Sequence, residues 1–101
     1  MALHYREVTA TLSDVDDATA AFLVDEDHDL SILTSVDWDG SIEYQVSYDE
    51  GATWRTVGSA FTGDLEDTAH INSVQHVRLV CTIHAAGTAS VLMRIGGGRR
   101  R

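Results

Sequence analysis

The chain has 101 residues and a mass of 11.0 kDa, which suffices for one domain with a modest core. It is too short for a propeller, a TIM barrel or a Rossmann pair. The chain has sixteen Asp and Glu residues but only seven Arg, so the formal net charge is −9. Because such a surface repels phosphate backbones, we expect the folded body to bind no nucleic acid. No apolar stretch is long enough to predict a membrane span.

Alternation of apolar and polar residues with a period of two dominates the chain and predicts strands. In chain order it covers residues 8–12, 18–24, 30–38, 42–48, 53–57, 68–71, 77–84 and 91–95, with a turn expected at Asp39-Gly40. The alanines of 18–24 also allow a short helix. Turn signals every 8–12 residues predict an all-β antiparallel sandwich, jelly-roll or immunoglobulin-like, or a small barrel, of seven or eight strands. Residues 1–95 form this single domain, and 96–101 form a flexible Gly-Arg tail.

The apolar positions of the alternation predict the core. They are Phe22, Ile32, Val36, Ile42, Tyr44, Val46, Trp54, Leu79, Ile83, Val91 and Met93. Cys81 follows the same pattern and is expected to be a buried apolar residue. It is the single cysteine, so the fold needs no disulfide. The first residues lack the basic and apolar segments of a secretory signal, and we expect the chain to fold in a cytoplasm.

One motif stands out. Ser47, Asp49, Gly51, Thr53 and Trp54 spell S-x-D-x-G-x-T-W. In a tight hairpin, Gly51 can adopt a positive φ, the Asp49 carboxylate can accept turn amides, and Trp54 can return onto the core. The motif resembles the Asp-box of sialidase-type proteins, which is a folding device. Sialidases carry several copies in a much longer propeller, so a sialidase is not expected here.

The longer stretch 42–57, with the pattern I-x-x-Q-x-S-x-D-x-G-x-T-W-x-x-V, resembles small β-sandwich structural proteins of tailed bacteriophages, as does the closing hairpin of 76–95. The resemblance covers about the last 60 residues, and the acidic first half has no counterpart. It implies a non-enzymatic virion protein, made in the host cytoplasm. A capsid decoration (cement) protein is the first expectation, and a tail or neck subunit is the variant. The partners would be the major capsid protein or another virion subunit and further copies of the chain, with a trimer as the guess.

Contacts with such partners are expected at the two ends of the chain, because termini have few other duties. The residues are Met1, Leu3, Tyr5, Arg6, Arg99, Arg100 and Arg101. For the three terminal arginines, a frayed solubilising tail is the alternative to a cationic hook for an acidic groove.

Metal and catalytic signals are weak. Asp25, Asp27 and Asp29, and separately Asp37 and Asp39, offer hard oxygens for Ca²⁺ but match no EF-hand loop. Ordinary turn chemistry is the alternative. The five histidines lack zinc-site spacing. His76 and His84, in neighbouring strand positions, are expected at the surface, and His28 in the charged loop 25–29. Without a nucleophile motif or a phosphate loop, we expect neither an enzyme nor a cofactor.

A carbohydrate-binding module is the alternative from another class. Trp38, Tyr48 and Trp54 would then be the stacking platforms. Against this alternative, Tyr44 and Tyr48 fall on the face expected to form the core, and Trp54 belongs to the hairpin motif.

Overall fold

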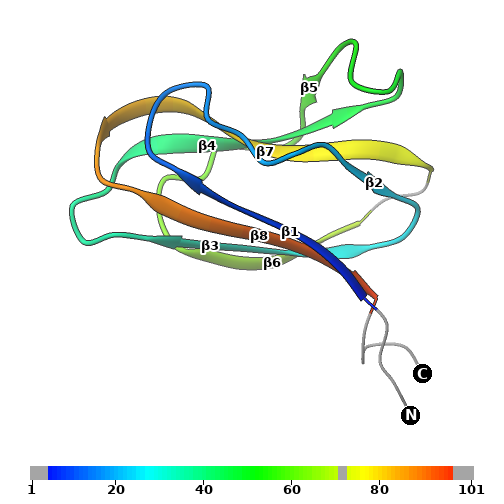
Figure 1. The fold of residues 1–101 in the computed structure, drawn as a ribbon, viewed down its shortest axis with the longest axis horizontal. Helices are drawn as coiled ribbons and strands as arrows, with labels where there is room; N and C mark the ends of the chain where they lie inside the picture. The colour runs from blue at the N-terminus through cyan, green and yellow to red at the C-terminus, as the bar shows by residue number, and fades with distance from the viewer. Residues whose placement is uncertain (1–4, 71–72, 97–101) are drawn as a thin grey trace.

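A computed structural model describes residues 5–70 and 73–96, which form two four-stranded antiparallel sheets packed against each other (Figure 1). The predicted all-β sandwich is therefore confirmed. The strands are β1 (Tyr5–Leu12), β2 (Phe22–Val24), β3 (His28–Thr34), β4 (Asp39–Ser47), β5 (Arg55–Thr56), β6 (Leu65–Ala69), β7 (Gln75–Ala86) and β8 (Ala89–Gly96).

The strand order is β1-β8-β3-β6 in sheet A and β2-β7-β4-β5 in sheet B. Strands pair first with last, as β1 with β8, β2 with β7, β3 with β6 and β4 with β5. Such nested pairs form when one long antiparallel ribbon is wound around itself, and this is the jelly-roll topology. Of the architectures expected from the sequence, the jelly roll is the one observed.

The core lies between the sheets and follows from the alternation, because every second side chain of a strand points to one face. In β8, for example, Val91, Met93 and Ile95 are buried while Arg94 is exposed. The buried apolar cluster consists of Leu12, Phe22, Val24, Leu30, Ile32, Ile42, Tyr44, Val46, Val77, Leu79, Cys81, Ala89, Val91, Met93 and Ile95.

Two predicted core residues are exposed instead. Val36 is 105% exposed, because β3 ends at Thr34 and Val36 lies in the following turn. Ile83 is 61% exposed, because the register between β4 and β7 shifts next to its partner Ser41, which interrupts the alternation. Trp54 is only half-buried.

Some predicted boundaries also move. Asp39 and Gly40, expected in a turn, are the first residues of β4. The turn is formed by residues 35–38, where the Trp38 amide donates to the Ser35 carbonyl (3.0 Å). Residues 18–24 contain no helix: β2 covers their last three residues, and Ala18 makes an isolated bridge to Val80. The strand expected at 68–71 is β6, which starts at Leu65.

The sandwich has two ends, which we name by the chain. At the terminal end, Tyr5 of β1 pairs with Gly96 of β8; the loops 25–27 and 48–54 lie at this end too, the loop 48–54 on the side of sheet B. At the distal end lie the turns 35–38 and 87–88 and the start of the loop 13–21. Figure 1 shows the terminal end on the right and the distal end on the left.

Candidate functional site

The motif residues form a bonded hairpin at the terminal end. The Gly51 amide donates to Ser47 Oγ (2.8 Å), and Ser47 Oγ donates to Asp49 Oδ1 (2.7 Å). Asp49 also accepts from the Thr53 hydroxyl (2.6 Å) and amide (2.9 Å). Gly51 has φ +90°, which L-residues adopt only with strain. The Thr53 hydroxyl, the Thr53 amide and the Ser47 hydroxyl together lower the pKa of Asp49 to about 2.

The fifth motif residue, Trp54, lies beside Arg78 rather than in the core. The Arg78 guanidinium carbon is 4.3 Å from the centroid of the indole ring. Arg78 Nε donates to Gln45 Oε1 (2.9 Å) across the β4–β7 pair. Since the neighbours of Arg78 in β7, Val77 and Leu79, are fully buried, the stack covers the outer face of sheet B. The prediction that Trp54 belongs to the core was wrong for this reason.

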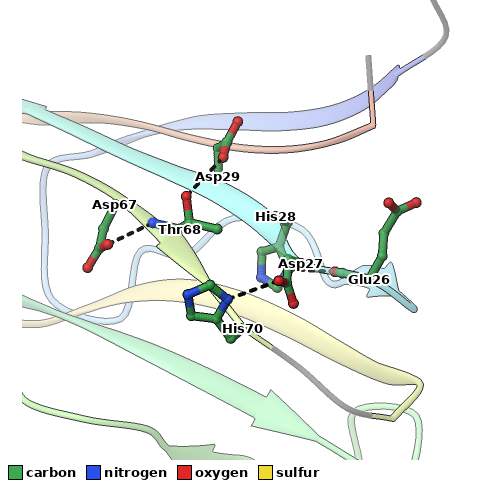
Figure 2. A network of polar contacts seen from close by, with 7 residues as sticks. All are labelled: Glu26, Asp27, His28, Asp29, Asp67, Thr68 and His70. Atoms are coloured by element: carbon green, nitrogen blue, oxygen red, sulfur yellow. Dashed lines mark hydrogen bonds and ion pairs between the residues drawn. The ribbon is translucent and has the colours of Figure 1, made fainter. Parts of the chain in front are cut away.

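The acidic loop that leads into β3 makes polar contacts with β6 (Figure 2). Asp27 Oδ2 lies 2.9 Å from His70 Nδ1, and both side chains are exposed. The Thr68 hydroxyl donates to Asp29 Oδ1 (3.3 Å). These contacts join β3 and the loop before it to β6 and the residue after it, at the β6 edge of sheet A.

The candidate calcium ligands are not brought together. Asp25 and Asp39 are exposed, Asp27 faces His70, and Asp29 lies on β3 opposite Arg94 of β8. Asp37 accepts from the Ser35 hydroxyl (2.6 Å) in the distal turn. Within residues 5–70 and 73–96, no three His, Cys, Asp or Glu side chains gather as a metal site.

His28, expected in a charged loop, is instead the first residue of β3 and is buried. His28 is 1% exposed, and its Nε2 lies 2.7 Å from the Tyr44 hydroxyl. Its Nδ1 lies 3.2 Å from the Glu26 carbonyl. Burial lowers its pKa. The sequence contained a signal for this, because His28 has the same parity as the core residues Leu30 and Ile32.

The outer face of sheet A is hollowed by shallow depressions, the largest of about 480 Å³, which share Ser31 of β3. Small and polar side chains line most of this surface. The largest depression is lined by Asp29, Leu30, Ser31, Glu66, Asp67, Thr68, Leu92 and Arg94. None of these described lining residues is aromatic, so the surface offers no stacking platform for a sugar ring.

Large apolar side chains are exposed at the distal end. Val15, Leu33, Val36 and Ile83 are between 49% and 105% exposed. They lie on the loop after β1, the end of β3, the turn before β4 and the end of β7. We name this set the distal apolar end. The sequence pattern did not indicate this set, because the alternation predicts Val36 and Ile83 in the core.

The predicted contact residues at the chain ends are partly described. Arg6 donates from Nη2 to the Leu23 carbonyl (2.7 Å), and its guanidinium carbon lies 5.0 Å from the Phe22 ring centroid. Arg6 therefore connects β1 of sheet A with β2 of sheet B. Tyr5 begins β1, and its side chain lies outside the described part. Met1, Leu3, Arg99, Arg100 and Arg101 also lie outside the described residues.

Comparisons with family models, curated proteins and solved structures found no match. The resemblance to phage structural proteins therefore rests on the sequence pattern. The described residues contain no helix long and apolar enough to cross a membrane.

Proposed function

We propose that the chain is a non-enzymatic structural subunit of a virus particle, a capsid decoration protein that binds the major capsid protein in multiple copies. The observation that supports this proposal most is the distal apolar end. Four of the eight large apolar side chains exposed in the described part of the chain lie toward this end, and apolar side chains that gather at a surface mark protein interaction sites. A surface of this kind fits a protein partner better than a small polar substrate.

The topology agrees with this proposal. Jelly rolls are common in viral capsid proteins and also in lectins. Because one fold hosts many functions, this agreement is an analogy and carries less weight than the surface.

The carbohydrate-binding alternative has less support, because the aromatic side chains do not form one platform. Trp38 precedes β4 and Tyr48 follows it, and a nine-residue strand separates two such positions by about 30 Å. Trp54 is stacked under Arg78. Tyr48 is exposed, contrary to the prediction that it faces the core.

The mechanism would be stabilisation by binding. A ligand that binds only the assembled shell shifts the equilibrium towards that shell, and several linked copies add their contributions. In this mechanism the sandwich acts as a rigid body that holds the distal apolar end against the particle.

Immunogold electron microscopy tests the proposal. Virus particles released from cells that carry this sequence would be labelled with an antibody against the chain. We expect label over the head surface, and a chain found only outside the particle fraction would contradict the proposal. Label restricted to the tail or neck would instead support the tail-subunit variant.

Rebinding to stripped particles tests the surface itself. We expect Leu33→Asp and Val36→Asp each to weaken rebinding at least tenfold, because each places a charge in an apolar contact. Val57→Asp is the matched control, since Val57 is exposed but lies outside the distal apolar end. Equal rebinding of all three variants would exclude the distal apolar end as the docking surface.

A further inference from the structure

The sandwich has four edge strands, and three of them carry features that prevent pairing with another chain. Edge strands expose unpaired backbone groups, which natural proteins protect by shortness or by charge. β2 has three residues and β5 has two. β6 carries Glu66 and Asp67 next to Asp64, in a chain of net charge −9. A second copy that approached any of these edges would find few backbone groups or a repulsive charge.

β1 lacks these protections. It is eight residues long and has one Arg and one Glu, so it is neutral within an acidic chain. It pairs with β8 on one side only, at the open side of sheet A (Figure 1). Among the described residues, no backbone group of β1 bonds to backbone outside β8. The Arg6 guanidinium is directed to Leu23 and Phe22 of β2.

We propose that β1 is the contact between two copies of this chain, paired antiparallel about a two-fold axis at Thr9. Sheets A of the two copies would then form one continuous eight-stranded sheet, in which main-chain hydrogen bonds supply much of the affinity. The partner is a second copy because β1 is compatible with itself in this register, whereas the acidic surface elsewhere repels a copy.

The register of the β1–β1 pair is decided by two conditions: like charges must not lie opposite each other, and side chains of both copies must share the same face of the sheet. In a continuous sheet, residues of equal parity lie opposite each other. An axis at Thr9 places Thr9 opposite Thr9, Val8 opposite Ala10 and Glu7 opposite Thr11 of the second copy. An axis at Glu7 or at Arg6 would place like charges directly opposite, which is destabilising. Axes at Val8 and at Thr9 both avoid like charges, and the Arg6 guanidinium is held at Leu23 and Phe22 in either register. The axis at Thr9 is preferred because it brings two exposed threonines opposite each other, and such Thr–Thr pairs stabilise antiparallel strands.

This pairing closes at two copies, because each copy contributes β1, the one long and neutral edge among the strands that the structure describes. It predicts a dimer where the phage resemblance implied a trimer. The proposal specifies the contact between copies within the proposed function. It is tested on the purified chain alone, so its failure leaves the particle proposal to the immunogold experiment.

Charge substitution at Thr9 tests the interface. Thr9 is exposed on the outer face of sheet A, opposite Leu92 of β8. By sedimentation equilibrium we expect the natural chain at twice 11.0 kDa. Thr9→Glu alone and Thr9→Lys alone should dimerise at least about tenfold more weakly, because like charges meet at the axis. An equimolar mixture of the two variants should recover the dimer. Ser90→Glu and Ser90→Lys are the matched controls. Ser90 is exposed on the neighbouring strand β8, which is not an edge strand, and both variants should remain dimeric.

A cysteine variant tests the register. Opposing Cα atoms in an antiparallel pair are about 4.5–5.5 Å apart, within the range that a disulfide spans. Thr9→Cys should therefore cross-link under mild oxidation and Ser90→Cys should not, while natural Cys81 is buried. A monomeric natural chain at high concentration would overturn the proposal. Dimers that persist in both single-charge variants, without a Thr9→Cys cross-link, would overturn it as well.

Discussion

His28 of β3 and Tyr44 of β4 form a hydrogen bond of 2.7 Å inside the core, and this bond joins the two sheets. The side chains are 1% and 5% exposed. For both contacts of the ring to be hydrogen bonds, Nδ1–H donates to the Glu26 carbonyl and Nε2 accepts from the Tyr44 hydroxyl. The arrangement requires a neutral imidazole, and burial lowers the pKa of His28 accordingly. Burial also raises the pKa of Tyr44, which keeps the phenol protonated.

The buried histidine predicts a loss of stability in mild acid. An unfolded His28 titrates near 6.5, and the folded one titrates lower. Below about pH 6.5 the unfolded state therefore binds more protons, and the free energy of unfolding falls until the pH passes the folded pKa. Urea unfolding over a pH series measures this slope. His28→Gln should flatten the slope, because it removes the buried imidazole. Equal slopes for the natural chain and His28→Gln would contradict the prediction.

Asp49 should be required for the hairpin that follows β4. Asp49→Ala removes the acceptor of the Thr53 amide and hydroxyl, so we expect a lower melting temperature. Glu50→Gln, which changes an exposed charge in the same turn, is the control and should leave the melting temperature unchanged.

The hydrogen bonds of Asp49 also predict a pH dependence. Because the folded pKa of Asp49 is about 2, its stabilising effect is present above pH 3.8 and is lost as the pH falls through 2. An NMR titration of the carboxyl group measures that value, and a midpoint near 3.8 would exclude these hydrogen bonds in solution.

The stack of Arg78 on Trp54 should be visible by fluorescence. In a Trp38→Phe background, Trp54 is the remaining tryptophan. We expect Arg78→Met to increase quenching of its emission by acrylamide and to lower stability by about 0.5–1 kcal/mol, since a cation–π contact is lost. Arg94→Met, on the outer face of sheet A, should change neither the quenching nor the environment of Trp54. Unchanged quenching in Arg78→Met would show that the indole is covered by other groups.

Alanine substitutions at Gly58 and Gly87 distinguish the cost of backbone strain from the cost of a steric clash. Gly87 and Gly58 both have positive φ, so alanine at either position should cost about 1–2 kcal/mol. A Cβ at Gly87 would also lie 2.6 Å from Trp38 Cα, whereas a Cβ at Gly58 meets nothing within 4 Å. Gly87→Ala should therefore be clearly less stable than Gly58→Ala in thermal melts. Equal melting temperatures would mean that the distal turn adjusts freely around residue 87.

The sandwich could be predicted because strand alternation is a local property that each segment shows by itself. The positions of the strand ends could not, because they depend on partners far along the chain. Ile83 continues the pattern of β7 without interruption, and it is exposed only because β4 shifts register beside it. The choice of a jelly roll over an immunoglobulin-like order also depends on pairings, such as Tyr5 with Gly96, that no local pattern contains.

The candidate site divides in the same way. The bonds among Ser47, Asp49 and Thr53 join residues within seven positions, so the motif alone indicates them. The Arg78–Trp54 stack and the contact of Arg6 with Leu23 join residues that are distant in sequence. The candidate calcium ligands show the opposite error. Nearness in sequence grouped them into two sets, Asp25, Asp27 and Asp29 and separately Asp37 and Asp39, but Asp27 contacts His70 and Asp37 contacts Ser35.

The pairing of Tyr5 with Gly96 has a mechanical consequence. Because β1 and β8 are antiparallel neighbours whose open ends meet at the terminal end, a force that separates Tyr5 from Gly96 loads their hydrogen bonds one pair at a time. The ladder unzips under such a pull, and it never carries the load in shear along its whole length. Load that enters through the faces of the sheets is instead shared by the interlocked core. The molecule should therefore withstand compression between neighbours far better than traction on its own backbone.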